Sequence, residues 1–156
     1  MNVRMRGWAL GMAAWVVLLA SGCGGSDDGV TADPSVAPFV GDWSASSLVI
    51  TSKANPDVST DVIADFNATF TINVQASGQY TAILLFAGQS QTEIGTISVS
   101  GSTVTMKVEV PEARTDVATF SFPDADHLIL DGSTTFDFNL DGTAEPATAH
   151  FDLARK

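Results

Sequence analysis

The chain has 156 residues and a formal net charge of −11, with 18 acidic residues against 7 basic ones. Such a charge repels nucleic acid and anionic membrane surfaces, so neither is expected as a direct partner of the folded protein. The sequence has one cysteine, so no disulfide can form within the chain.

The first 22 residues have the features of an export signal. Arg4 and Arg6 precede an uncharged run at 8–20, which reads WALGMAAWVVLLA. This run is too short for a bilayer-spanning helix, which needs about 20 apolar residues, and it is typical of a signal-peptide core. Residues 1–22 are therefore predicted to be a signal peptide.

Small residues at 20–22 stand directly before Cys23, in the stretch ASGCGG. This stretch resembles the lipobox of bacterial lipoproteins, although Ala20 stands where that motif usually has leucine. The resemblance implies cleavage before Cys23 and acyl chains, such as palmitate, on that residue. It also implies a place in the cell envelope, with the membrane contacted through the lipid. Because Gly24 rather than aspartate follows, that place is the outer membrane if the host is Gram-negative.

Cleavage would leave 134 residues, enough for one domain with a hydrophobic core. Five basic residues would then stand against all 18 acidic ones, a net charge of −13. Residues 23–38, CGGSDDGVTADPSVAP, hold too few large apolar side chains to form a core. They are predicted to be a lipid-anchored flexible tether.

From residue 39 to the end, apolar and polar residues alternate in short runs separated by turn residues, and no helical stripe lasts beyond about a turn. The longest gap, 53–65, is predicted to be a large loop, and Gly132-Ser133 and Asp141-Gly142 are among the predicted turns. Strands are predicted at 43–52, 66–75, 79–87, 93–100, 102–110, 117–122, 127–132, 133–140 and 146–155.

Alternation within these runs places apolar residues on one face of each strand. Two runs show it most clearly: Phe66, Ala68, Phe70, Ile72 and Val74, and then Val104, Met106, Val108 and Val110. A sheet with one apolar face and few helical residues to cover it is expected to close on itself. The predicted class is all-β, a single antiparallel up-and-down meander β-barrel of eight or nine strands over 39–156.

The run FVGDWSASSLVIT at 39–51 contains the pattern Gly41-x-Trp43, and a succession of hairpins follows it. This arrangement resembles bacterial lipocalin-like lipoproteins. The resemblance implies a barrel in which an arginine near the C-terminus packs over the motif tryptophan. Arg155 shares a face with Leu153, so the resemblance implies a Trp43–Arg155 pair. Alternatively, Arg155, next to the last residue, extends into solvent.

Residues suited to catalysis are scarce. His127 and His150 are the only histidines, and neither belongs to a nucleophile motif or a zinc-binding spacing. We therefore expect no enzymatic activity, no cofactor and no built metal site.

Binding in the barrel interior is the more natural function. If the barrel is hollow, we expect a small hydrophobic ligand such as a fatty acid, lipid fragment or isoprenoid. If the side chains fill it, we expect a structural protein that contacts another envelope protein through its acidic surface and the 53–65 loop. The residues predicted to line a cavity are Trp43, Phe70, Tyr80, Leu84, Phe86, Met106, Phe120, Phe136, Phe138 and Phe151.

The stretch DFNLDGTAE at 137–145 allows two interpretations. Asp137, Asn139 and Asp141 have the spacing of the first ligands of a calcium loop, which would make this a calcium-stabilised surface domain. However, the twelfth position, where such loops have glutamate, holds Thr148. The favoured interpretation is the outer face of a strand that enters a hairpin at Asp141-Gly142.

Overall fold

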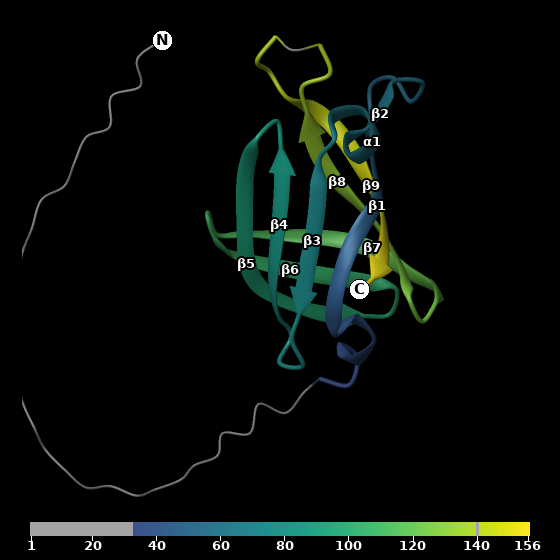
Figure 1. Cartoon of the computed structure of the whole chain (residues 1–156), viewed down its shortest axis with the longest axis vertical. Coiled ribbons are helices and arrows are strands. Elements are labelled where there is room, and N and C mark those ends of the chain that lie inside the picture. Colours follow the sequence, from purple (N-terminus) through teal and green to yellow (C-terminus); the bar gives the residue numbers. More distant parts are fainter. Residues whose placement is uncertain (1–32, 140) are drawn as a thin grey trace, which may run out of the picture.

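The protein is described by a computed structural model that covers residues 33–139 and 141–156. The predictions for the signal peptide and for Cys23 lie outside these described residues. Figure 1 shows a barrel of long strands with little helix. The elements are η1 (Ala37–Phe39), β1 (Gly41–Ser52), β2 (Ser59–Asp61), α1 (Val62–Phe66), β3 (Thr69–Val74), β4 (Gln79–Phe86), β5 (Gln89–Ser100), β6 (Thr103–Val110), β7 (Arg114–Asp124), β8 (His127–Phe136) and β9 (Glu145–Arg155).

The strands form an antiparallel meander that closes into a barrel. Neighbours pair in the order β2-β1-β3-β4-β5-β6-β7-β8-β9, and β1 also pairs with β9. Eight strands, β1 and β3 to β9, make up the barrel, while β2 is a short addition to β1. The predicted all-β, up-and-down barrel is confirmed.

The prediction of two strands at 127–132 and 133–140 is wrong, because β8 is one strand that runs through Gly132. Gly132 pairs with Ala118 on one side and with Ala149 on the other. A Cβ at Gly132 would meet the Ala118 Cβ at 3.6 Å, an ordinary contact. The glycine therefore marks no turn, and strand pairing on both sides outweighs its low strand propensity.

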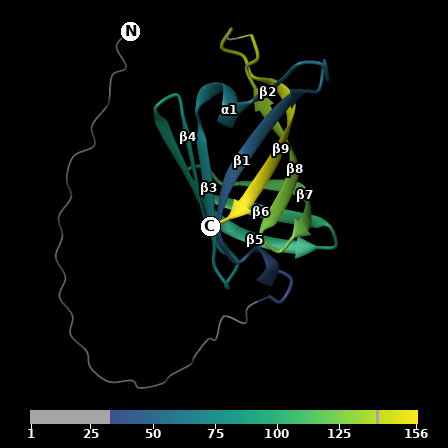
Figure 2. The same ribbon diagram turned by 45° about the vertical axis from the view of Figure 1, so that its right-hand side comes forward.

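The 53–65 segment is more structured than a loop, since it contains β2 and the start of α1. Helix formation over 62–66 also delays the predicted strand at 66–75, which begins only at Thr69. Phe66, predicted to lie on the apolar face, is consequently 46% exposed. In Figure 2, α1 and β2 lie at one end of the barrel and η1 lies at the other.

The predicted boundary between tether and barrel is too late in the chain. Val36 is 2% exposed and belongs to the core, as does Phe39 in η1. The Phe39 ring packs edge to face on Phe120 and Phe122, with centroid distances of 4.8 and 5.1 Å. The packed domain therefore includes residues ahead of 39, because these two apolar side chains plug the lower end of the barrel.

Val110 does not lie on the apolar face with Val104 and Val108, as alternation predicted. The register of β6 on β5 shifts, so that Val110 pairs with Ile94 while Val108 pairs with Gly95. One extra residue on β6 turns Val110 outward, where it is 47% exposed, whereas Val108 is 1% exposed. This is the effect of a β-bulge, which reverses the facing of every residue beyond it.

Candidate functional site

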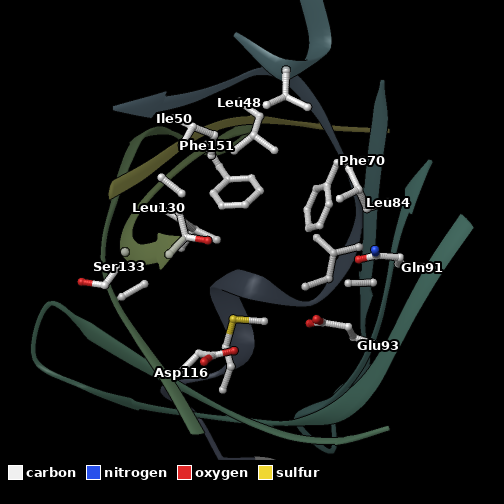
Figure 3. Close-up of a pocket in the computed structure, with 18 of the residues that line it drawn as sticks. Leu48, Ile50, Phe70, Leu84, Gln91, Glu93, Asp116, Leu130, Ser133 and Phe151 are labelled. Atoms are coloured by element: carbon white, nitrogen blue, oxygen red, sulfur yellow. The ribbon is translucent and has the colours of Figure 1, made fainter. Parts of the chain in front are cut away.

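The barrel encloses a cavity of about 450 Å³. This volume lies within the range of about 300–1,000 Å³ found for small-molecule sites. The wall is mostly apolar and is contributed by all eight barrel strands and α1. In Figure 3 the rings of Phe70 and Phe151 lie next to each other, with centroids 5.0 Å apart. The interior thus combines the two alternatives, with a cavity in one part and a filled core cluster around Trp43 and Phe39 at the end that holds η1.

Six of the ten residues predicted to line a cavity do so. They are Phe70, Leu84, Phe86, Met106, Phe136 and Phe151. Each lies on the inward side of a barrel strand, which alternation in the sequence identified.

The other four predicted residues pack elsewhere. Trp43 is fully buried in the core cluster at the lower end, and Phe120 packs against that cluster. Phe138 follows β8 and packs on Phe136, with ring centroids 5.0 Å apart. Tyr80 is 1% exposed and lies on the inner side of β4, outside the cavity wall. Alternation in the sequence predicts which side of a strand a residue faces. It does not predict the position of that residue along the barrel axis, and this position decides whether the side chain reaches the cavity.

The cavity opens sideways between β7 and β8. Their pairing runs from Ala118 opposite Gly132 down to Asp124 opposite His127. Beyond Ala118 the strands take different directions (Figure 1). The consecutive residues 116–118 and 132–136 all line the cavity. Because neighbours in a strand face opposite sides, a run of consecutive lining residues shows that the cavity reaches the strand edges.

A charged cluster that the sequence did not predict lies at this opening. Arg114 Nε donates to Asp116 Oδ2 at 2.8 Å, and a second nitrogen of the guanidinium pairs with Glu93. The hydrogen bond to Glu93 raises the pKa of Arg114. All three side chains line the cavity and are 31–46% exposed. The sequence shows that Glu93 faces the barrel interior, since it alternates with Gly95 and Ile97. However, charged residues were not expected on the interior face.

Tyr80 lies behind the cavity wall, where the charges of this cluster act on it. Its ring packs close to Gly95, where an added Cβ would lie 3.0 Å from Tyr80 Cε1. The hydroxyl group is buried and has no hydrogen-bond partner among the described residues. Burial raises the pKa of Tyr80 to about 12, and the negative charge of Glu93 adds to this effect. The phenol is therefore neutral at physiological pH.

The base of the barrel contains the Trp43–Arg155 pair that the lipocalin resemblance implied. The guanidinium carbon of Arg155 lies 4.1 Å from the centroid of the Trp43 ring. Arg155 also donates to the carbonyl oxygens of Val40 at 2.6 Å and Pro38 at 3.2 Å. The arginine thus ties the C-terminal strand to the chain that enters β1, and it does not extend freely into solvent.

Residues 137–139 and 141–144 lie between β8, which ends at Phe136, and β9, which begins at Glu145, so they are not the outer face of a strand. The two carboxylate oxygens of Asp137 accept hydrogen bonds from the backbone N–H groups of Asp141 and Gly142 at 3.2 and 2.8 Å. Asn139 Oδ1 also accepts from Asp141, at 3.0 Å. Asp141 in turn accepts from Thr143 at 2.8 Å. These oxygens support the loop's own backbone, which explains the polar pattern without a cation.

No group of three or more His, Cys, Asp or Glu side chains that could hold a metal ion occurs within 33–139 and 141–156. The two histidines each form a surface pair. His127 Nδ1 lies 2.7 Å from Asp124, and His150 Nδ1 lies 2.7 Å from Asp131. Both pairs lie outside the set of residues that line the cavity.

Fold and cavity together define the class, an eight-stranded antiparallel up-and-down β-barrel, consistent with a lipocalin-like fold, with a mostly apolar cavity. No protein-family model matches the chain, and no curated protein matches it. Among the described residues no helix is long and apolar enough to cross a membrane.

Proposed function

We propose that the protein binds a small hydrophobic molecule in the barrel, without catalysis, while anchored to the cell envelope by lipid on Cys23. The observation that carries the binding role is the cavity of about 450 Å³ with its apolar wall. An apolar molecule placed there gains about 25 cal/mol for each Å² of surface removed from water. The opening between β7 and β8 provides a way in that does not require the barrel to unfold.

The anchor is supported by ASGCGG at 20–25 and by the position of the packed domain. Ten positions separate Cys23 from Asp33, the first described residue. A fully extended chain of that length spans at most about 35 Å. The barrel would therefore stay close to the membrane, which is where hydrophobic ligands concentrate. Mass spectrometry of the protein extracted from membranes tests this, with acyl chains expected on the wild-type protein and none on Cys23→Ala.

The binding role is tested by filling the cavity. Ala118 lines the cavity at its opening, whereas the next residue, Thr119, is exposed on the outer face. Ala118→Phe is expected to weaken binding of dodecanol at least about tenfold, because the new ring occupies the ligand's space. Thr119→Phe adds the same ring outside and is expected to leave binding unchanged.

Both variants are first compared with the wild type by circular dichroism, and binding is then measured by native mass spectrometry and calorimetry. Retention of dodecanol by Ala118→Phe at wild-type affinity would show that the ligand lies elsewhere. Failure of the folded wild-type protein to bind dodecanol, decane or a phospholipid would remove the proposed function.

A further inference from the structure

One side of the otherwise apolar cavity is charged. Gln91 and Glu93 from β5 and Arg114 and Asp116 from β7 contribute to the wall where the cavity opens. In Figure 3 the carboxylate of Glu93 and the amide of Gln91 point into the pocket, and the rings of Phe70 and Phe151 lie in another part of it. A wholly apolar ligand would make no hydrogen bond or ion pair with these groups. A ligand with a polar end would, because polar groups in a binding site fix the orientation of such a ligand.

Among the side chains that line the cavity, the balance of charge is negative. Arg114 is shared between Glu93 and Asp116, so two carboxylates stand against one guanidinium. Lys53 is not among the lining residues, but its Nζ donates to the hydroxyl of Ser133, which is, at 2.9 Å on the β8 side. The chain as a whole carries −11, which adds a field that attracts cations and repels anions.

The Tyr80 hydroxyl is a further polar group in this part of the barrel, although it lies behind the cavity wall. It is buried without a partner among the described residues, and the charges of Glu93, Arg114 and Asp116 act on it. A buried hydroxyl without a hydrogen bond is costly, and native proteins almost always satisfy such groups. The chain therefore leaves one hydrogen bond unmet behind the cavity wall.

We propose that the ligand is an amphiphile with a cationic head group, and that it binds with its tail among Phe70, Leu84 and Phe151 and its head at Glu93 and Asp116. This inference rests on the proposed binding function and adds the chemical class of the head group. The free oxygens of the two carboxylates accept hydrogen bonds from an ammonium group, while Arg114 keeps them in place.

An anionic head such as a fatty-acid carboxylate fits this opening poorly. It would meet Glu93 and Asp116, and the only guanidinium in the cluster is already paired with both. The partial exposure of these side chains, 31–46%, suits a charged head, which then keeps part of its hydration. The fatty acid named among the expected ligands is therefore the disfavoured member of that set.

The test uses the purified protein and three probes with the same twelve-carbon tail, namely dodecylamine, dodecanol and dodecanoate, each below its micelle concentration. Calorimetry at neutral pH measures the three dissociation constants. Dodecylamine is expected to bind about tenfold more tightly than dodecanol, since two partly exposed carboxylates each contribute a few-fold. Dodecanoate is expected to bind more weakly than dodecanol.

Two variants locate the effect. Glu93→Gln combined with Asp116→Asn is expected to abolish the preference for dodecylamine over dodecanol. Asp124→Asn combined with Asp131→Asn removes the same charge from surface pairs outside the cavity wall and is expected to keep it. Arg114→Gln frees both carboxylates, so it is expected to strengthen dodecylamine binding about threefold. This last variant gains function, so it remains informative if the double variant fails to fold.

The outcomes separate the two claims. If dodecanol binds in the cavity but the amine shows no preference, or dodecanoate binds as tightly as dodecylamine, the head-group inference is overturned and the binding function stands. If none of the three probes binds the folded protein, both the head-group inference and the proposed binding function are wrong. A preference for the amine that survives the Glu93 and Asp116 substitutions would also overturn the assignment of these residues.

Discussion

At the scale of single residues, the Gly41-x-Trp43 pattern has a direct physical basis. An added Cβ at Gly41 would lie 2.6 Å from Arg155 Nη1, and the backbone there has φ +132°. Trp43 is fully buried and donates from Nε1 to the Phe39 carbonyl oxygen at 2.8 Å. Glycine therefore leaves room for the arginine, and the tryptophan ring supports it from below.

Gly41→Ala is expected to lower the free energy of unfolding by about 2–4 kcal/mol, through backbone strain and displacement of Arg155. Gly88→Ala is the matched control, because Gly88 has φ +74° but nothing within 4 Å of an added Cβ. Gly88→Ala introduces backbone strain without a steric clash, so it should lower the free energy of unfolding by about 1–2 kcal/mol. Urea unfolding of both variants checks this, and equal losses would show that contact with Arg155 is unimportant.

The charged cluster at the cavity also consists of a few single residues. Glu93 and Asp116 occupy inward positions of their strands, and alternation alone would have found them. Sequence reasoning assigned the inward side to apolar residues, because charged residues are rarely buried without partners. Here the partner, Arg114, is supplied by the pairing of β6 with β7, which places it beside the cavity.

At the scale of elements, α1 is short and depends on its N-cap. Asp61 Oδ1 accepts from the backbone N–H groups of Ile63 and Ala64 at 3.0 and 3.3 Å. The same carboxylate accepts from Ser47 Oγ at 2.8 Å and from Leu48 N–H at 3.2 Å in β1. One side chain thus starts the helix and fastens it to the barrel at the end where Val62 lines the cavity.

The pH dependence of this contact follows from its pKa. Burial by itself would raise the pKa of Asp61, but the hydrogen bond from Ser47 and those from backbone N–H groups outweigh it and lower the pKa. A lowered folded-state pKa means that the carboxylate stabilises the fold above its unfolded pKa, about 3.9. That stabilisation is lost as the pH falls through the folded-state value.

Asp61→Asn is therefore expected to cost about 1 kcal/mol at pH 7, with the difference from wild type shrinking below about pH 4. Urea unfolding at pH 7 and at pH 3 measures it. Asp57→Asn, in the same segment and exposed, serves as the control for loss of charge and should change little at either pH. A difference between Asp61→Asn and wild type that stays constant with pH would contradict the assignment of this carboxylate.

The β-bulge in β6 is a second feature of a single element that affects the cavity side. Beyond it Val110 faces outward beside Ile94, and a Cβ at Gly95 would lie 2.1 Å from the Lys107 carbonyl oxygen. The close backbone approach requires glycine at that position. It also leaves room for the ring of Tyr80, which extends from β4 over Gly95, so the bulge and the position of the buried hydroxyl arise together.

At the scale of the whole molecule, closure depends on both ends of the domain. β9 pairs with β1 over Trp43 to Ser52, and Val36 and Phe39 plug the lower opening. The core contacts described here are made within 33–156. The domain that folds is accordingly longer at its start than composition indicated.

A chain that begins at residue 33 is expected to keep the unfolding free energy of one that begins at residue 23. A chain that begins at residue 40 loses the two plugging side chains and should be less stable by at least about 3 kcal/mol. Urea unfolding monitored by Trp43 fluorescence compares the three. Equal stability of the chains starting at 33 and 40 would show that the plug is dispensable.

Local pattern determined much of this protein from the sequence alone. Alternation and turn residues predicted the strands and the single apolar face, and a sheet with such a face must close or be covered. The inward positions of Phe70, Leu84 and Phe151 followed from the same period of two. These features depend on neighbours along one strand, so one strand is enough to predict them.

Only the tertiary structure decided what depends on distances between strands. The bulge that turns Val110 outward, the divergence of β7 from β8 and the empty volume inside the barrel are set by register and by how eight strands close. That same closure brings Arg114 and Asp116, neighbours on one face of β7, beside Glu93 of β5. The sequence therefore determined that the sheet has an interior face and which residues lie on it. Only the closed barrel decided that part of the interior is a cavity and that one part of the cavity wall is charged.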